Sequence, residues 1–271
     1  MIVAVTGGKG GTGKTSVAVS LAHHLQSMGR HTVLVDADVE APNVHIITGA
    51  EMREVETVTT KFPRINEEKC IKCGLCARAC PTSALAFIPG KIPLFFKENC
   101  VGCMLCQRVC PVGAIEAVDE RTGAVREGNW GEIPVVDGIA DVGVEETAKI
   151  VEAVLKRALE RTGDIKIIDT AAGIHCNVAR AIMAADMAIA VTEPTPFGIR
   201  DMRKAIQLVQ ALGKPMKIVA NKWGINERYE GLIRQTAENL GVPLHTIPFS
   251  KDYHRRYAQG TFQPLPVEGI L

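Results

Sequence analysis

Short apolar runs rich in valine and isoleucine alternate along the chain with longer segments in which apolar residues recur every three or four positions. The first run, IVAVTGG at 2–8, breaks into glycines, and a helical segment with an apolar face follows from Thr15 to about Met28. The run at 31–38 ends in two carboxylates, after which the pattern decays near Pro42. Continuous apolar runs predict buried strands, and a period near 3.6 predicts helices. The chain is therefore expected to begin with strand, loop, helix and strand.

The same alternation resumes near residue 143 and continues to residue 249. Strands separated by helices of this length are typical of parallel sheets with right-handed crossovers. The sequence therefore predicts an α/β fold with a doubly wound, mostly parallel sheet. The expected elements are a helix at 143–161, a strand at 165–169, a helix at 177–185, a strand at 187–193, a helix at 198–212, a strand at 216–221, a helix at 228–240 and a strand at 243–249.

Residues 61–118 interrupt this pattern with an internal repeat of cysteines, each set followed by a proline. The first set is Cys70, Cys73, Cys76 and Cys80, and the second is Cys100, Cys103, Cys106 and Cys110. In this spacing three thiolates on one tight loop bind a [4Fe-4S] cube, and the fourth cysteine reaches the other cube. Zinc sites rarely need a doubled run of this kind, and disulfides do not suit a chain of cytosolic character.

The repeat therefore predicts an inserted bacterial-type ferredoxin domain with two [4Fe-4S] clusters. We expect one cluster on Cys70, Cys73, Cys76 and Cys110, and the other on Cys100, Cys103, Cys106 and Cys80. The predicted organisation is a first part of the α/β domain at 1–60, the insert at 61–118, and a second part of the α/β domain at 119–271. The stretch 119–138 has turn and strand character.

Charge and composition indicate which classes of binding partner and which cellular compartment to expect. The 31 basic and 30 acidic residues give a net charge of +1, so neither nucleic acid nor an anionic membrane is expected as the main partner. The insert holds eight basic against four acidic residues, an excess that two cubes of roughly −2 each would cancel. The N-terminus has no basic leader, and no apolar run is long enough to span a bilayer, which predicts a cytoplasmic protein.

The loop after the first strand matches the phosphate-binding pattern G-x4-G-K-[ST]. It comprises Gly8, Lys9, Gly10, Gly11, Thr12, Gly13, Lys14 and Thr15. Glycines let backbone N–H groups curl around phosphate oxygens, and the helix N-terminus adds its dipole. Lys14 is expected to reach the β- and γ-phosphates of ATP, and the Thr15 hydroxyl to coordinate Mg²⁺. The position between a strand and a helix is the context that this motif requires.

Lys9, five positions before Lys14, makes the loop resemble the deviant Walker A motif of the MinD/ParA group of ATPases. That group includes the nitrogenase iron protein and cluster-carrier ATPases. The resemblance implies that Lys9 crosses the interface of a homodimer, or of a dimer with a paralogue, to touch the partner's phosphates. Such a lysine would stabilise transition-state charge only in the closed dimer. An ordinary solvated loop lysine is the alternative.

The resemblance covers nearly all of the chain outside the insert and implies further roles. Asp36 would lie near Mg²⁺, Asp38 would orient or deprotonate the attacking water, and Asp169 would hold a magnesium-bound water. Asn221 and the Pro248–Phe249 backbone would read the adenine. The alternative for the aspartates is that they only cap the turns after their strands.

Two departures from the group are visible in the sequence. Ala171 and Ala172 replace the usual prolines before Gly173, which predicts a more flexible loop. The chain ends TFQPLPVEGIL, whose prolines exclude the basic amphipathic membrane helix of the division-site ATPases. The basic, aromatic run at 251–257 is expected to be a solvated loop, with contact to nucleic acid as the alternative.

The ninth cysteine, Cys176, lies seven residues after Asp169, an offset comparable to that of the bridging-cluster cysteine in the nitrogenase iron protein. A symmetric dimer would bring only two such thiolates together, so His175 or an added thiol would have to complete a site. A small buried core residue is the alternative for a free cysteine.

These features predict an ATP-hydrolysing iron–sulfur protein in which dimer closure is coupled to electron transfer or metallocluster maturation. The partner would be an unidentified redox or metalloenzyme-maturation protein. Two alternatives remain open: a cluster carrier that donates a labile cube from Cys176, and a ParA-like positioning ATPase with purely structural clusters.

Overall fold

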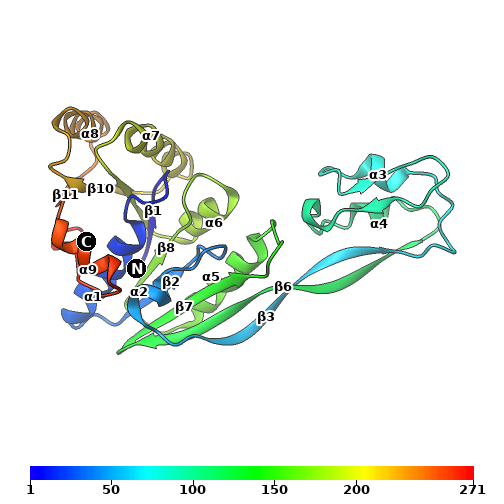
Figure 1. Cartoon of the computed structure of the whole chain (residues 1–271), viewed down its shortest axis with the longest axis horizontal. Coiled ribbons are helices and arrows are strands. Elements are labelled where there is room, and N and C mark those ends of the chain that lie inside the picture. The colour runs from blue at the N-terminus through cyan, green and yellow to red at the C-terminus, as the bar shows by residue number, and fades with distance from the viewer.

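The computed structural model describes residues 1–271 as a body and an arm that ends in a small lobe (Figure 1). Nine strands form one sheet in the order β11-β10-β9-β1-β8-β2-β7-β6-β3, and β4 and β5 form a second sheet in the lobe. The strands are β1 (Ile2–Thr6), β2 (Thr32–Asp36), β3 (Arg53–Ile65), β4 (Leu85–Ala86), β5 (Leu94–Phe95), β6 (Ile115–Trp130), β7 (Ile133–Ala140), β8 (Ile165–Asp169), β9 (Met187–Thr192), β10 (Met216–Trp223) and β11 (Leu244–Pro248). The helices are α1 (Lys14–Ser27), α2 (Val44–Thr48), α3 (Leu75–Ala79), the 3₁₀ helix η1 (Lys97–Asn99), α4 (Leu105–Arg108), α5 (Ala148–Glu160), α6 (Cys176–Ala184), α7 (Pro196–Ala211), α8 (Glu227–Leu240) and α9 (Lys251–Ala258).

The strands from β11 to β7 are all parallel, which confirms the predicted mostly parallel α/β sheet. Alternate residues of each strand enter different cores: Val3 and Val5 pack with α1 and α2, whereas Ala4 packs with α6. Both sides of these strands are covered, so their sequences read as continuous apolar runs. The carboxyl ends of β1, β2, β8, β9 and β10 therefore meet at one edge of the sheet, where polar residues gather.

Two predictions about local structure were wrong. The helix expected at 143–161 begins only at Ala148, and residues 141–147 form a loop before it. The run expected as a loop at 251–257 is helix α9, whose N-cap Ser250 accepts a hydrogen bond from the Tyr253 N–H. The chain after α9 then returns to the body, where Leu265 and Ile270 join the core that contains α1.

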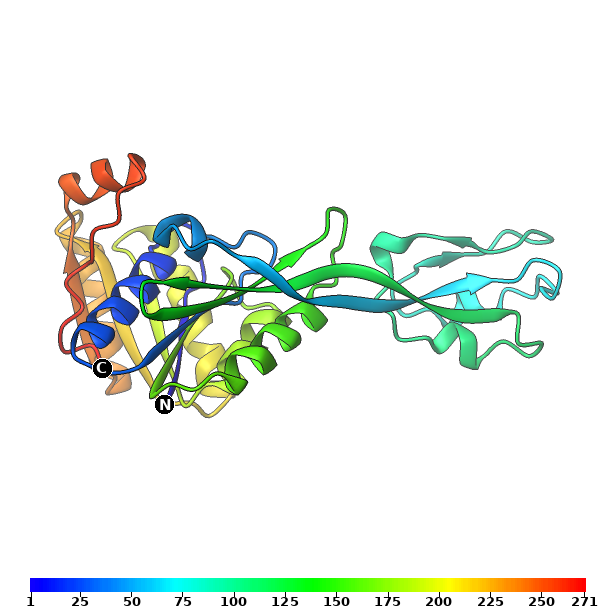
Figure 2. The same ribbon diagram turned by 90° about the horizontal axis from the view of Figure 1, so that it is seen from below.

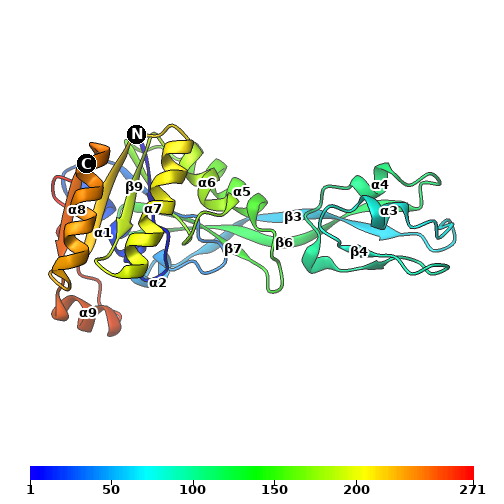
Figure 3. The same cartoon turned by 90° about the horizontal axis from the view of Figure 1, so that it is seen from above.

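The arm is an antiparallel ribbon made by β3 and β6, which pair from Arg53–Glu127 to Ile65–Ile115. The inner half of β6 also pairs with β7, so the ribbon continues the main sheet. Beyond the body, the outer half of the ribbon continues as two strands without further neighbours and twists toward the lobe (Figures 2 and 3). The expected boundaries after residues 60 and 118 both fall inside these strands. The lobe is therefore attached by hydrogen-bonded strands and not by flexible linkers.

The lobe, residues 66–114, repeats its backbone conformation at an offset of 30 residues. Three pairs of positions have left-handed backbone in both halves: Lys72 (φ 56°) with Gly102 (66°), Gly74 (70°) with Met104 (55°), and Ser83 (55°) with Gly113 (60°). A left-handed backbone is costly for residues other than glycine. Its recurrence at the same places in each cysteine loop indicates that both loops are held in one shape. The lobe packs on the ribbon through Phe95, whose ring lies 6.1 Å from that of Phe62.

No helix anywhere in the structure has the length and apolar character that crossing a bilayer requires.

Candidate functional site

The phosphate-binding loop connects β1 to α1 and needs its glycines for space. Gly13 adopts φ 94° as the N-cap of α1, and a side chain there would come within 2.3 Å of the Asn221 amide nitrogen. A side chain at Gly8 would lie 2.2 Å from the carbonyl oxygen of Asp201 on α7. The loop is thus enclosed by residues that are distant in sequence, and a Cβ at either position would displace them.

Lys14 lies inside this loop and is 7% exposed. Its Nζ donates to the carbonyl oxygen of Lys9 at 3.1 Å. Burial lowers the pKa of Lys14, while the carboxylates of Asp169 and Asp38 act in the opposite direction. The lysine therefore faces the acidic groups at the strand ends, in the place where an added anion would meet it.

Asp36 and Asp169 end the neighbouring strands β2 and β8, where they are paired in register. Asp36 is completely buried. One carboxylate oxygen accepts from the N–H of Asp38 at 3.0 Å, and the other accepts from those of Asn43 (2.8 Å) and Val44 (2.9 Å). Burial raises the pKa of Asp36 to about 7 despite these bonds. Asp36 therefore does cap the turn after β2, as the alternative interpretation expected.

Asp169 has the environment of an incomplete cation site. Its side chain is buried, and its Oδ1 has no hydrogen-bond partner. Burial and the charge of Asp36 raise its pKa well above the ordinary value, whereas a hydrogen bond with the Thr15 side chain opposes the rise. Mg²⁺ prefers oxygen ligands of this kind. The orphan oxygen, the Asp36 carboxylate and the Thr15 hydroxyl therefore fit a magnesium ion.

Asp38 is the third carboxylate at this edge. Burial raises its pKa, the carboxylate of Glu40 adds to the rise, and Lys14 opposes it. A water-activating base gains from a pKa nearer to neutrality, so the position suits the predicted role.

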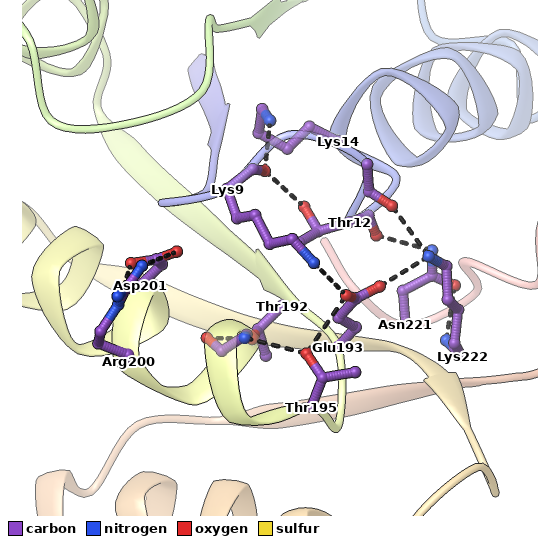
Figure 4. A network of polar contacts seen from close by, with 12 residues as sticks. Lys9, Thr12, Lys14, Thr192, Glu193, Thr195, Arg200, Asp201, Asn221 and Lys222 are labelled. Atoms are coloured by element: carbon purple, nitrogen blue, oxygen red, sulfur yellow. Dashed lines mark hydrogen bonds and ion pairs between the residues drawn. The ribbon is translucent and has the colours of Figure 1, made fainter.

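Lys9 is held by a carboxylate that the sequence analysis missed (Figure 4). Its Nζ lies 3.0 Å from one oxygen of Glu193, and the Nζ of Lys222 lies 2.6 Å from the other. Lys222 also donates to the carbonyl oxygen of Gly11 at 2.9 Å. Burial acts to raise the pKa of Glu193, but the bonds from Lys222 and Lys9 hold it below the ordinary value. In this single chain, therefore, Lys9 contacts its own subunit and is not a free solvated lysine.

Glu193 follows the apolar run of β9 directly, as Asp36 and Asp169 end theirs. Ligand-binding side chains of parallel sheets gather at such strand ends. In the sequence, a carboxylate directly after a predicted buried strand would have identified Glu193 as a candidate site residue.

The predicted adenine-reading residues lie at the same edge. The Asn221 amide donates to the carbonyl oxygen of Thr12 at 2.9 Å, and its side-chain oxygen accepts from the N–H of Lys222. Pro248 ends β11 opposite Trp223 on β10. Phe249 is exposed, and its ring lies 4.9 Å from that of His254. The structure thus brings Asn221 onto the phosphate-binding loop and leaves Phe249 at the surface of the adjoining strand.

The eight cysteines of the lobe line two hollows, each with four thiols, and none forms a disulfide. The distal hollow, beside the ribbon ends Ile65 and Ile115, is lined by Cys70, Cys73, Cys76 and Cys110. The proximal hollow, beside Pro63, is lined by Cys80, Cys100, Cys103 and Cys106. These are the two sets that the sequence analysis proposed, each with its fourth cysteine from the other half of the repeat.

The two hollows share one kind of lining. Apart from the four thiols, the residues around each hollow are mostly apolar and include no histidine or carboxylate. No three histidine, cysteine or acidic side chains converge closely enough to hold a single ion. Four thiols around one hollow, three from one loop and the fourth from the other, match the ligand set of a [4Fe-4S] cube.

Backbone N–H groups support the two exchanged cysteines in the same way. Ala84 N–H donates to the Cys80 sulfur at 3.3 Å, and Ala114 N–H donates to the Cys110 sulfur at 3.2 Å. Only the proximal hollow has an extra contact, because the Thr82 hydroxyl lies 3.7 Å from the Cys80 sulfur. The corresponding residue of the second half is Val112.

Cys176 is the first residue of α6, directly after His175, and it is exposed. The alternative of a small buried core residue is therefore wrong. Cys176 lines neither hollow.

Comparison with known proteins gives a consistent result. The family model described as the CobQ/CobB/MinD/ParA nucleotide binding domain matches residues 3–263. Uncharacterized protein MJ0579 of Methanocaldococcus jannaschii is 38% identical over 84% of this chain and 82% of its own length. Uncharacterized protein MJ0578 of the same organism is 33% identical over 93% of this chain and 86% of its own length.

Among solved structures, the septum site-determining protein MinD of Pyrococcus horikoshii in complex with Mg-ADP superposes with a TM-score of 0.57. The alignment covers 96% of this chain and 86% of that one, at 20% identity. This likeness concerns the fold. The iron–sulfur cluster carrier protein of Pyrococcus abyssi is 47% identical, but over only 53 residues, or 20% of this chain and 18% of its own.

Proposed function

The chain belongs to the CobQ/CobB/MinD/ParA nucleotide-binding family, and we propose that it is an ATP-driven iron–sulfur protein. ATP binding between two subunits would alter the environment of two [4Fe-4S] clusters held in the lobe. The partner would be a redox protein or a metalloenzyme under maturation. The clusters would supply one-electron chemistry, whereas the protein's own residues bind the nucleotide, hold the clusters and link the two.

The nucleotide half of the proposal rests on the edge where five strands end. Lys14 and the N-terminus of α1 offer positive charge to phosphates, and Asp36, Asp169 and Thr15 offer oxygens to Mg²⁺. Asp38 stands beside them as the candidate base. Lys9 would leave Glu193 and reach the partner subunit's nucleotide when the dimer forms, because its side chain is 38% exposed and can exchange one anion for another.

The cluster half rests on the two four-cysteine hollows. In each, three thiols come from one loop of the repeat and the fourth comes from the other. Each cluster would thereby tie both halves of the lobe together. Removing ligands from one set should weaken this tie but leave the four thiols of the other hollow in place.

The observation that carries the coupling is the continuity of the sheet. Asp36 pairs in register with Asp137 on β7, β7 pairs with β6, and β6 with β3 forms the arm. A hydrogen-bonded ladder thus connects the strand that ends at the magnesium site with the strands that carry the lobe. A change at Asp36 has a rigid path to the clusters, which a module on flexible linkers would lack.

The proposal is tested by an anaerobic redox titration of the reconstituted protein, followed by EPR, with and without non-hydrolysable ATP. We expect a nucleotide-dependent shift in the midpoint potential of at least one cluster. Reciprocity then requires that reduction change the affinity for nucleotide. Identical spectra and potentials in the two titrations would rule the coupling out.

Replacement of Thr82 by valine is expected to lower the potential of the proximal cluster only. A hydrogen bond to a ligand sulfur favours the more negative, reduced state, so its loss favours oxidation. A bond worth about 0.5–1 kcal/mol corresponds to roughly 20–40 mV for one electron. The control is Val112→Thr, which offers a hydroxyl at the corresponding distal position and should raise the other potential. Equal shifts of both potentials in Thr82→Val would contradict this assignment.

A cluster carrier remains the second candidate because Cys176 is exposed at the start of α6, where a second protein can reach it. It predicts additional iron that depends on Cys176 and is transferred to apo-ferredoxin. Iron that is unaffected by Cys176→Ala and does not transfer would exclude this candidate.

A further inference from the structure

Thr147 is a buried threonine whose hydroxyl connects two segments that are far apart in sequence. It is 1% exposed and stands at the N-cap of α5, yet its side chain does not cap that helix. Instead it donates to Glu40 at 3.2 Å and accepts from the side-chain amide of Asn177 at 2.6 Å. The helix therefore does not need the hydroxyl, and both of its bonds go to other elements.

Both partners belong to segments that surround the nucleotide site. Glu40 lies two residues after Asp38, close enough for its charge to raise the pKa of that residue. Asn177 is the second residue of α6 and follows the loop that begins at Asp169. The N–H of Gly173 in that loop donates to the carbonyl oxygen of Gly7 at 3.1 Å. A shift of either segment would thus alter one of the two hydrogen bonds of Thr147.

The residues just before Thr147 lie against the loop that carries Cys100. Gly143, Val144, Glu145 and Glu146 face Lys97, Glu98 and Cys100 across a small hollow, together with ribbon residues Thr60, Phe62 and Thr122. The cysteine loop that contains Cys100 and Gly102 also approaches helix α5. A side chain at Gly102 would lie 2.6 Å from the Thr60 methyl and 3.8 Å from the Lys149 Nζ. The loop at 141–147 therefore contacts the proximal cysteine loop at one end and both nucleotide-site segments at the other.

We propose that Thr147 is a positioning residue that transmits the state of the nucleotide site to the proximal cysteine loop. A buried hydroxyl that loses a partner is unfavourable, so residues 38–43 and 170–177 can separate only if the loop at 141–147 moves with one of them. That movement displaces Glu145 and Glu146 relative to Lys97 and Cys100. This inference rests on the proposed function and names the contact through which nucleotide would act on the proximal, and not the distal, hollow.

The test is Thr147→Val in the full-length holoprotein, because valine keeps the shape and removes the hydroxyl. The readout is hydrogen–deuterium exchange of residues 97–104 with and without a non-hydrolysable ATP analogue, which reports local opening and needs no turnover. In the native protein the analogue should change this exchange rate severalfold. In Thr147→Val the change should fall to less than about a third of the native change, with the analogue still bound, since the loop then responds to neither segment.

Matched variants separate positioning from general stability. Thr147→Ser keeps the hydroxyl and should retain the response. Thr236→Val makes the same substitution at a half-buried threonine whose hydroxyl bonds within α8, and it should leave the response intact. Asn177→Ala breaks the same contact from the other side at a partly exposed position, so it serves even if Thr147→Val folds poorly. Adding Thr147→Val to Asn177→Ala should remove only the part of the response that still reaches the loop through Glu40, so the double variant should match Thr147→Val alone.

Two results would overturn the inference. The first is a native response of residues 97–104 that persists in both Thr147→Val and Asn177→Ala. The second is a native protein in which nucleotide leaves the exchange of 97–104 unchanged. If the redox titration still shows a nucleotide-dependent potential in either case, only this route fails. If the titration of the native protein shows no nucleotide dependence, the proposed function itself fails.

Discussion

Lys9→Ala is expected to lower the turnover number for ATP by about 10³-fold or more, the scale measured for cations that act on a partner's phosphates. The affinity for Mg-ADP should stay within about twofold, because the side chain does not help to build the phosphate-binding loop. Its Nζ lies on Glu193, whereas the Lys9 carbonyl oxygen that accepts from Lys14 survives the substitution. Steady-state hydrolysis and ADP binding by calorimetry measure the two effects.

A mixing experiment shows whether Lys9 acts across the dimer. Lys9→Ala and Asp38→Ala should each be inactive alone. A mixed dimer has one site with the Asp38 of the first chain and the Lys9 of the second. Equal amounts should therefore recover about a quarter of the native activity, since half of random dimers are mixed and each has one complete site. A mixture that stays inactive would show that Lys9 acts within its own chain.

The second large effect concerns iron. The intact chain is expected to bind about eight iron atoms, four in each hollow. Cys76→Ala with Cys110→Ala should keep about four, because both cysteines line the distal hollow. Cys76→Ala with Cys80→Ala should lose nearly all, because these two line different hollows. Iron analysis of anaerobically purified protein gives the counts directly.

The opposite pattern would mean that each cluster takes its four cysteines from one half of the repeat. A native protein without iron would end the iron–sulfur proposal altogether. Cys176→Ala is the control, since its thiol lines neither hollow, and iron content should not change.

The elements that were predicted well are those whose signal is local. The β1–loop–α1 unit can be predicted from consecutive residues, because an apolar strand, a glycine loop and a helix start each have a recognisable sequence pattern. The cysteine pairing was accessible for the same reason, since the repeat places equal loops at a constant offset. In the first case the deciding residues lie within one loop, and in the second they recur at a constant interval of 30 residues.

The strand character expected at 119–138 covers part of β6, but β3 was not predicted. Most residues of β3 are exposed. Val58, Thr60 and Phe62 alternate as buried positions, but Thr60 is polar, so the apolar pattern is too short to mark a strand.

Residues 143–147 were assigned to the helix of α5 for a related reason. They are compatible with a helix start, and tertiary contacts hold the loop in another shape. Among these are the bonds of Thr147 with Glu40 and Asn177, and that from the Asp141 N–H to the Thr122 carbonyl oxygen.

The sequence alone determined the class of sheet, the phosphate-binding loop and the thiol sets, because each depends on residues that are neighbours or repeat at a constant interval. The tertiary structure alone decided that Lys9 is held by Glu193, 184 positions away, and that Thr147 joins Glu40, 107 positions before it, to the α6 segment. It also decided that the ribbon which carries the cysteine lobe continues the main sheet. Contacts between such distant residues arise when the strands take their order in the sheet, and no local pattern records that order.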